Sequence, residues 1–305
     1  MKAVRFSQFG GPEVLEIVDL PDPHPGPGQV RIEVRAAGIN PSDWKKRRGM
    51  MDQELPQTMG YEAAGVVDEL GEGVADASIG DQVFGFSAEG AAQAELAVLS
   101  DYAPIPPSLD FSGAAGLPAV IETATRVLDQ LGLGSGSTLL INGASGNVGS
   151  AAVQLAVARG ARVIGTCSPA NLEYLQSLGA EAVTYGAGFI EQVRALAPDG
   201  IDAAFDVAGS GVLPQLIELA GGAEHVMTIA DFRGAQEHEV RFSSGDTGRA
   251  IYALAEIGPL IEAGAFSLPI AQTFALTEVA DAHRVGEDGH VRGKLVLLVG
   301  SPIGA

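Results

Sequence analysis

The sequence predicts an α/β protein in two parts, a β-rich amino-terminal part followed by a doubly wound parallel sheet. Up to about residue 117, short runs of β-forming residues are separated by Gly and Pro. From about residue 137, strand-sized apolar runs alternate with helical patterns, as in βαβ units. With 46% hydrophobic and 18% charged residues among 305, the chain has enough apolar material for one large or two ordinary domains.

The β-rich part contains four runs with the composition of strands. They cover residues 30–36, 64–70, 82–86 and 94–98. The Pro-Gly-Pro-Gly run at residues 25–28 predicts a turn. The prolines within residues 104–107 predict an extended connector, because proline cannot continue a helix. We expect this connector to lead into the second domain.

The second part begins with a strand, a glycine-rich loop and a helix. Its five expected strands are 138–142, 162–166, 182–185, 201–206 and 224–229. Apolar residues recur from Val148 at i, i+3, i+4, i+7 and i+8, which predicts a buried helix after the first strand. Farther along we expect a strand-like segment at 238–242, a helix over about 248–263, a β-like segment at 270–276, a short helix near 278–284 and a final strand at 294–299.

The charge of the chain excludes several classes of partner. Eighteen Lys and Arg against 38 Asp and Glu give a formal net charge of -20, which repels nucleic-acid phosphates and anionic membrane surfaces. The apolar runs are far shorter than the ~18 residues of a membrane span. The amino terminus has no apolar signal segment, so we expect a cytoplasmic protein. The single Cys167 excludes an intrachain disulfide and a multi-thiolate metal site, and we expect it to be packed.

The loop after the strand at 138–142 has the features of a phosphate-binding turn. Its three glycines allow a tight turn, close approach of a pyrophosphate to the backbone, and close helix–strand packing. The helix N-terminus adds free N–H groups and a partial positive charge. The strand–loop–helix order favours this function over a tight turn without a ligand. The expected cofactor-binding residues here are Gly143, Ala144, Ser145, Gly146, Asn147, Val148 and Gly149.

Motifs along the whole chain carry a resemblance to a known family. They are MKAV at 1–4, GGPEVL at 10–15, AGINPSDW at 37–44, GYEAAGVV at 60–67, GDQVFG at 80–85, the glycine loop, and RGKLVL at 292–297. In these segments the chain resembles the medium-chain dehydrogenases/reductases, specifically their zinc-free quinone oxidoreductase (zeta-crystallin-like) branch.

The resemblance implies a domain organisation and an assembly. A GroES-like β-barrel catalytic domain would comprise residues 1–117, completed by a discontinuous C-terminal segment at 265–305. A Rossmann NADP-binding domain at 118–264 would lie between them in the sequence. Similar enzymes often form homodimers, and the strand-like segment 238–242 is a candidate sheet edge for a two-fold mate to cover.

The residues after the second strand of the parallel sheet indicate NADPH as the cofactor. An NAD-specific fold places an acidic residue there to bond the ribose 2′-hydroxyl, whereas residues 166–169 read TCSP. Ser168, Asn171 and Tyr185 can donate hydrogen bonds to a 2′-phosphate. Because many similar enzymes carry Lys or Arg near position 171, we expect a modest preference for NADPH. The alternative for Ser168 and Asn171 is to cap the helix that follows.

The resemblance also implies that the catalytic zinc of related dehydrogenases is missing. Their ligand positions correspond to Asn40 and Tyr61, and neither residue type is a usual zinc ligand. The histidines show no ligand spacing. We expect surface positions for all five, His24, His225, His238, His283 and His290. Without a Lewis acid, we expect hydride transfer to a small-molecule quinone or α,β-unsaturated carbonyl, whose oxyanion needs only hydrogen-bond donors and water.

Five residues are candidates for the acceptor site by the resemblance. The Asn40 amide would donate to the oxyanion, helped by Tyr61; a turn-forming Asn and a buried structural Tyr are the alternatives. Trp44 would supply an aromatic wall, and Asp43 would be structural or would orient the substrate. Thr123 matches a family threonine beside the nicotinamide, with helix-internal back-bonding as its alternative.

Two further features concern the approach to the reaction centre. The nicotinamide is expected near Ala208 and Ile229, beyond the carboxyl ends of the fourth and fifth strands, facing a cleft formed with the N-terminal domain. The basic run at residues 45–48 is either a solvated helix face or a patch that steers an anionic cofactor or substrate.

The leading hypothesis is therefore an NADPH-dependent quinone or enone reductase. An enoyl-thioester reductase of the same architecture is the alternative among enzymes, although residues 50–52 offer no tyrosine as a proton donor. Outside enzymes, the alternative is a non-catalytic NADPH-binding protein, resembling crystallin or adaptor members of the zeta-crystallin-like group. NADPH oxidation in the presence of a simple quinone would distinguish these classes.

Overall fold

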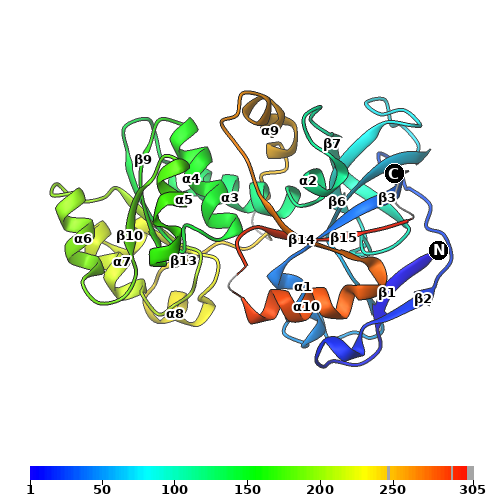
Figure 1. The fold of residues 1–305 in the computed structure, drawn as a ribbon, viewed down its shortest axis with the longest axis horizontal. Helices are drawn as coiled ribbons and strands as arrows, with labels where there is room; N and C mark the ends of the chain where they lie inside the picture. Colours follow the sequence, from blue (N-terminus) through cyan, green and yellow to red (C-terminus); the bar gives the residue numbers. More distant parts are fainter. Residues whose placement is uncertain (246–247, 290, 301–305) are drawn as a thin grey trace. The chain divides into compact units, whose positions relative to one another are not determined.

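The computed structural model describes residues 1–245, 248–289 and 291–300, and it contains two compact units (Figure 1). The first unit comprises Met1–Ala119, Leu254–Ala263 and the described residues from Leu268 onward. The second comprises Val120–Ala253 and Gly264–Ser267. The units differ from the boundaries expected above chiefly in residues 254–263, which group with the first unit. No described helix has the length and apolar character needed to span a membrane.

The first unit is built mainly from strands. Its strands are β1 (Lys2–Phe6), β2 (Glu16–Asp19), β3 (Val30–Ile39), β4 (Gln57–Thr58), β5 (Glu62–Leu70), β6 (Gln82–Ser87), β7 (Leu96–Pro104), β14 (Ile270–Ala275) and β15 (Lys294–Leu298). Its helices are α1 (Pro41–Arg47), α2 (Phe111–Ala115), α9 (Ala253–Glu262) and α10 (Val279–Asp288), with short 3-10 turns at Pro12–Val14 and Leu276–Glu278. Helices α1 and α10 contact each other (Figure 1).

The main sheet of the first unit closes on itself. Its strand order is β14-β15-β3-β5-β6-β7, and β3 also pairs with β7, so four strands form a closed ring. Along β3 the side chains of Val30, Ile32 and Val34 are buried at alternate positions, which is the period of a strand with one face on a core. The expected GroES-like β-barrel and its completion by the C-terminal strands are confirmed.

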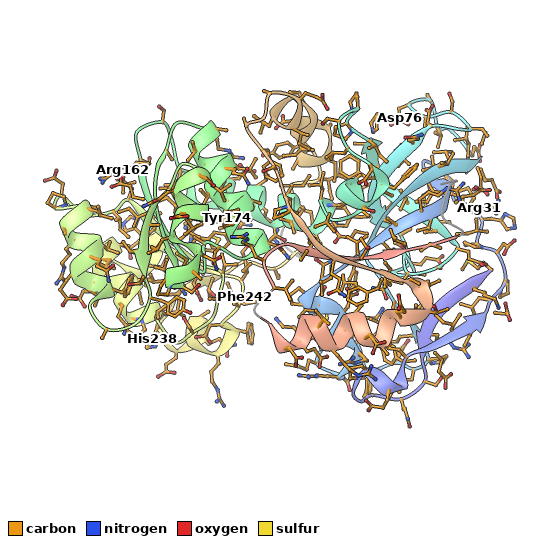
Figure 2. The ribbon with its side chains drawn as sticks, viewed as in Figure 1. Arg31, Asp76, Arg162, Tyr174, His238 and Phe242 are labelled. Atoms are coloured by element: carbon orange, nitrogen blue, oxygen red, sulfur yellow. The ribbon has the colours of Figure 1, made fainter. Side chains whose placement is uncertain are left out.

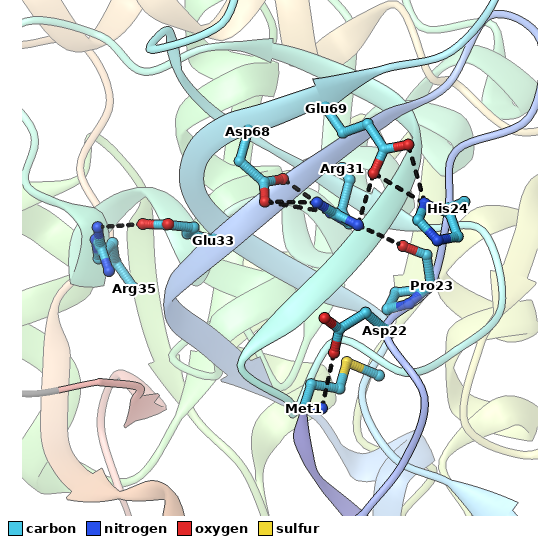
Figure 3. A network of polar contacts seen from close by, with 9 residues as sticks. All are labelled: Met1, Asp22, Pro23, His24, Arg31, Glu33, Arg35, Asp68 and Glu69. Atoms are coloured by element: carbon cyan, nitrogen blue, oxygen red, sulfur yellow. Dashed lines mark hydrogen bonds and ion pairs between the residues drawn. The ribbon is translucent and has the colours of Figure 1, made fainter.

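A polar network fixes the outer side of this barrel (Figure 3). The Arg31 guanidinium on β3 binds Asp68 on β5 through two nitrogens, at 3.0 and 2.9 Å. It also donates to the Pro23 carbonyl at 3.0 Å and pairs with Glu69 at 2.6 Å. His24 lies 3.0 Å from the same Glu69 carboxylate. The network therefore ties the proline-rich turn before β3 to two strands of the barrel.

The second unit is a six-stranded parallel sheet with helices between the strands. Its strands are β8 (Thr138–Asn142), β9 (Arg162–Cys167), β10 (Glu181–Thr184), β11 (Ala203–Asp206), β12 (Val226–Thr228) and β13 (Arg241–Phe242). Its helices are α3 (Pro118–Leu131, whose first two residues group with the first unit), α4 (Asn147–Ala158), α5 (Leu172–Ser177), α6 (Phe189–Leu196), α7 (Leu213–Ala220) and α8 (Phe232–Glu237), with 3-10 turns at Pro169–Asn171 and Ala223–His225.

The order of these strands is that of a dinucleotide-binding sheet. It runs β10-β9-β8-β11-β12-β13, and every neighbouring pair is parallel. Apolar residues of α6 and α7, including Val193 and Leu216, pack on Leu140, Ile164 and Val226 of the sheet. The predicted doubly wound α/β fold is confirmed.

The expected strand at 238–242 is wrong over its first half. His238 ends α8 by donating its N–H to the Gly234 carbonyl, and Glu239 has a left-handed φ of 56°. The chain therefore turns before the strand begins, and β13 has only two residues. Phe242 packs edge-on against Phe232 with ring centroids 5.2 Å apart; Figure 2 labels His238 and Phe242. Helix α9 is also shorter than the expected 248–263.

Candidate functional site

The glycine loop of the second unit has three glycines with three different surroundings. Gly143 has a φ of +81°, which other residues rarely adopt. A Cβ at Gly149 would lie 2.3 Å from the Gly143 carbonyl oxygen, so only glycine lets α4 approach the loop this closely. A Cβ at Gly146 would meet nothing nearer than that oxygen at 3.5 Å. The space beside Gly146 is therefore open to a ligand.

Helix α4 begins directly after this open position. Gly146 is its N-cap and has no side chain to satisfy the first N–H groups of a 12-residue helix. The N-terminus of such a helix carries a partial positive charge that favours a phosphate. Loop and helix together have the form that suits a pyrophosphate, and the backbone around Ser145, Asn147 and Val148 is the candidate for holding it.

Three residues of the expected cofactor site lie together at the end of β9. The Asn171 amide donates to Ser168 Oγ at 3.2 Å and to Ser145 Oγ at 3.4 Å. Ser168 and Asn171 both occupy helix-cap positions, but neither makes a side-chain capping bond. Tyr185 is exposed after β10. The cluster consists of neutral hydroxyl and amide groups. Such groups can donate hydrogen bonds to a phosphate, but they bind it more weakly than a Lys or Arg side chain would.

A row of buried polar side chains crosses the carboxyl ends of four strands, and the sequence analysis missed it. Thr166 donates to Asn142 Oδ1 at 2.8 Å, and Asn142 donates to Asp206 Oδ1 at 2.9 Å. Thr228 donates to Asp206 Oδ2 at 2.7 Å. The available signal was a polar residue at the last position of three of these apolar strands and at the last but one of β9, which is unusual for buried strands.

Ala208 and Ile229 lie directly beyond this row. The Ala208 N–H donates to Asp206 Oδ1 at 3.2 Å, and the Ile229 N–H donates to the Asp206 carbonyl at 3.1 Å. Ala208 is exposed and Ile229 is half-buried. Cys167, at the end of β9, is buried, as expected for a packed residue, and burial raises the pKa of its thiol.

Thr123 lies on α3 of the same unit beside a buried ion pair. Arg126 Nε donates to Glu122 Oε1 at 2.8 Å, and both side chains are buried. The Thr123 hydroxyl donates to Glu122 Oε2 at 3.3 Å and accepts from Arg126 at 3.5 Å. Its hydrogen bonds therefore go to side chains and not to the preceding turn.

In the first unit, Asn40 is the centre of a buried network. Its amide nitrogen donates to Glu62 Oε1 at 2.7 Å, and its amide oxygen accepts from Lys294 Nζ at 2.7 Å. Lys294 also pairs with Glu62 at 2.7 Å. Asn40 is only 7% exposed. One N–H of its side-chain amide is used by Glu62, and the other N–H takes no part in this network.

Asp43 lies under Asn40 at the start of α1. Its Oδ2 accepts the Asn40 backbone N–H at 2.8 Å. Its other carboxylate oxygen is buried without a hydrogen-bond partner among the described residues. Burial raises the pKa of Asp43 to about 7, against the opposing effect of the Asn40 N–H. A structural role for Asp43 is consistent with these contacts.

Tyr61 precedes Glu62 and is half-buried. Its hydroxyl lies 3.9 Å from Met51 Sδ, and Lys46 Nζ lies 5.5 Å from the centre of its ring. Burial raises the pKa of Tyr61 to about 12, with the nearby Asp43 and Asp52 carboxylates adding to the effect. The phenol therefore stays protonated at neutral pH and can donate a hydrogen bond.

The structure corrects the expectation of surface histidines. His24 and His225 are exposed, but His283 on α10 is fully buried, with Trp44 edge-on at 6.4 Å and Arg47 Nη1 at 3.2 Å from its Nδ1. The buried imidazole is neutral, and its Nδ1 accepts a hydrogen bond from the Arg47 guanidinium. His290 lies outside the described residues. Burial, reinforced by the Arg47 charge, lowers the pKa of His283 to about 3.

The basic run at residues 45–48 is not a uniformly solvated face. Arg47 is fully buried and pairs with Glu287 of α10. Lys46 is half-buried and donates to the Thr58 carbonyl at 2.8 Å. Arg48 also pairs with Glu287, at 2.6 Å. These contacts hold α1 in place, and that limits any steering role to the exposed Lys45 and Arg48.

No group of three or more His, Cys, Asp or Glu side chains suited to a metal ion occurs among the described residues. Asn40 and Tyr61 stand at the positions expected for zinc ligands, and each has a lysine beside it. Lys294 donates to the Asn40 amide oxygen, and Lys46 Nζ lies 5.5 Å from the centre of the Tyr61 ring. A cation is a poor neighbour for a metal ion, since both carry positive charge.

Two family models match the chain. Residues 26–116 match the alcohol dehydrogenase GroES-like domain, and residues 178–297 match the zinc-binding dehydrogenase model. An NADPH-dependent alkenal/one oxidoreductase of Arabidopsis thaliana is 33% identical, over 97% of this chain and 79% of that protein.

Solved structures are similar over nearly the whole chain. The quinone oxidoreductase from Coxiella burnetii is 34% identical with a TM-score of 0.85, covering 98% of this chain and 99% of that one. A mycobacterial protein in complex with NADPH is 28% identical with a TM-score of 0.81, covering 98% and 100%. The chain is thus a member of the medium-chain dehydrogenase/reductase superfamily of NAD(P)H oxidoreductases, in its quinone and alkenal oxidoreductase branch.

Proposed function

We propose that the protein is an NADPH-dependent reductase that transfers hydride to a quinone or an α,β-unsaturated carbonyl without zinc. The observation that carries this proposal is the open backbone at Gly146 followed by the neutral cluster of Ser145, Ser168 and Asn171. Open backbone fits a pyrophosphate, and hydroxyl and amide donors without a carboxylate fit a 2′-phosphate. Relatives whose names include NADPH support the choice of cofactor.

When bound, NADPH supplies the hydride, and the residues of this chain orient both reactants. Within the second unit, Ala208 and Ile229 would hold the nicotinamide, and Thr123 is the candidate residue beside it. Within the first unit, Trp44 and Tyr61 would contact the acceptor. The second N–H of the Asn40 amide donates to the acceptor oxygen as negative charge develops there, and water supplies the proton. Lys294 strengthens this donor by binding the amide oxygen of the same group.

The direct test is NADPH oxidation, followed at 340 nm, with a panel of quinones and enones and the purified full chain. Removing one oxyanion donor commonly reduces the rate on the order of a hundredfold. Asn40→Ala should therefore lower kcat by about that factor and leave NADPH affinity nearly unchanged. Ser42→Ala, on the first turn of α1, is the matched control and should retain full turnover. If Asn40→Ala keeps the turnover of Ser42→Ala, the amide is structural.

We also propose a homodimer that covers the edge strand β13. This strand ends the parallel sheet and has only two residues, and Phe232 beside it is 58% exposed. An uncovered edge with an exposed aromatic favours association with a second copy. Light scattering at micromolar concentration tests this, because a monomer would contradict it.

A further inference from the structure

We propose that Asp206 is a positioning residue that holds the three loops expected to carry the cofactor in one arrangement. The inference rests on the proposed function, because these loops are expected to bind the cofactor. The hydrogen bonds that hold the loops are those of the protein without cofactor. Asp206 ends β11, and its side chain is 1% exposed. We call the row Thr166, Asn142, Asp206 and Thr228 the polar belt; it joins β9, β8, β11 and β12 in their order across the sheet.

Three of the four members of the polar belt also hold the backbone of a loop. The Gly143 N–H donates to Thr166 Oγ1 at 3.0 Å. The N–H groups of Ala208 and Gly209 donate to Asp206 Oδ1 at 3.2 and 3.0 Å. Those of Ala230 and Asp231 donate to Thr228 Oγ1, both at 3.1 Å. The belt therefore binds the pyrophosphate loop at one end and the two loops flanking the expected nicotinamide at the other.

The direction of every hydrogen bond in the belt is fixed by chemistry. The Thr228 hydroxyl accepts two backbone N–H groups, so its own hydrogen must be donated, and it goes to Asp206 Oδ2. Asp206 Oδ1 accepts three donors, from Asn142, Ala208 and Gly209. A position that accepts on both oxygens requires a carboxylate, because an amide would present a donor on one side.

Asp206→Asn should disturb one side of the belt more than the other. If its amide oxygen keeps the three donors on the Oδ1 side, its NH₂ group faces a Thr228 hydroxyl that has no lone pair to spare. The loop at Ala230 and Asp231 should then loosen more than the loop at Gly143. Thr228→Val should loosen the same loop, and Thr166→Val should loosen only the Gly143 loop, because each removes the acceptor of those N–H groups.

The experiment measures amide hydrogen exchange in the unloaded full chain and then NADPH binding by fluorescence titration. Exchange at Ala230 and Asp231 should rise in Asp206→Asn and Thr228→Val. The NADPH dissociation constant should rise by on the order of tenfold in Asp206→Asn, with the KM for the acceptor little changed. Asp202→Asn is the matched control, since Asp202 accepts the Thr138 N–H at 2.7 Å at the opposite ends of β8 and β11.

The outcomes separate this inference from the proposed function. Unchanged loop exchange, or an NADPH dissociation constant for Asp206→Asn within twofold of that for Asp202→Asn, overturns the positioning role. A wild type that binds no NADPH overturns the proposed function, while the exchange pattern still decides whether the belt holds the loops. If Asp206→Asn does not fold, the contrasting patterns of Thr228→Val and Thr166→Val provide the same test.

Discussion

The Lys294 ammonium lies 2.7 Å from Glu62 Oε1, and both side chains are almost completely buried although 232 positions separate them in the chain. Lys294 begins β15, and Glu62 begins β5. The pair recovers its desolvation cost through additional hydrogen bonds, from Lys294 to Asn40 at 2.7 Å and from the Ala119 N–H to Glu62 at 2.6 Å. It therefore locks the C-terminal strands to the barrel at the candidate acceptor site.

Lys294→Met should destabilise the protein by about 3–5 kcal/mol, because it leaves the Glu62 carboxylate buried and unpaired. The free energy of unfolding from a denaturant titration measures the loss. Combining Lys294→Met with Glu62→Gln should recover part of it, since the unpaired charge is then removed. Lys2→Met is the control, because Lys2 pairs with Asp19 at 3.2 Å on the surface. Equal stability of Lys294→Met and Lys2→Met would rule out this role for the buried pair.

Gly146→Val and Gly149→Val should fail in different ways. The first fills open space, so the unloaded protein should fold with nearly the wild-type melting temperature, while NADPH affinity falls at least about a hundredfold because the backbone is no longer accessible. The second brings a Cβ to 2.3 Å from the Gly143 oxygen and should lower the melting temperature. Calorimetry with and without NADPH measures both effects. NADPH binding by Gly146→Val at wild-type affinity would contradict the pyrophosphate assignment.

Ser168→Asp should reverse the cofactor preference. Its carboxylate would lie among the donors of Asn171 and Ser145, where it repels a 2′-phosphate and can accept from a 2′-hydroxyl. We expect the ratio of NADPH to NADH affinity to fall by about tenfold or more in fluorescence titrations. Ser177→Asp adds the same charge at the far end of α5 and should leave the ratio unchanged. A wild type that binds NADH more tightly than NADPH would show that this loop was misinterpreted.

The sequence predicts those parts of the fold whose cause is local. The strand at 138–142 and the glycine loop follow from neighbouring residues, and β8 has the expected bounds. The left-handed turn at Glu239 had no signal, because this backbone is normally marked by Gly or Asn. The expected strand was therefore too long at its start.

The sequence predicts which residues belong to the candidate sites better than it predicts which side chains those residues contact. Asn40 was identified from its motif, but its bonds to Glu62 and Lys294 depend on strands that only the folded barrel brings together. The belt centred on Asp206 likewise depends on the order of strands in the sheet. Burial of His283 depends on α1 packing against α10. The local signal was its place on the same face of α10 as Val279 and Ala282, at the i, i+3, i+4 spacing.

His283 should make the protein less stable in acid. Burial and the Arg47 guanidinium lower its pKa from 6.5 to about 3, so the neutral ring is the form compatible with the fold. Above pH 6.5 the ring is neutral in the folded and unfolded chains, and its contribution to stability is complete. As the pH falls from 6.5 toward 3, only the unfolded chain binds the proton, and up to about 1.4 kcal/mol of stability is lost per pH unit.

His283→Gln should remove this loss, because Gln retains an acceptor for Arg47 but takes up no proton. Urea titrations at pH 7.5, 6 and 5 give the free energy of unfolding of both proteins, and the slope with pH is the quantity compared. The pKa of Asp43 is raised to about 7, so this carboxyl contributes more to the stability of the fold as the pH falls. Because Asp43 is present in both proteins, its contribution cancels when their slopes are compared. His24→Gln, at an exposed histidine, should keep the wild-type slope. Equal slopes for His283→Gln and His24→Gln would mean that His283 is protonated in the folded protein.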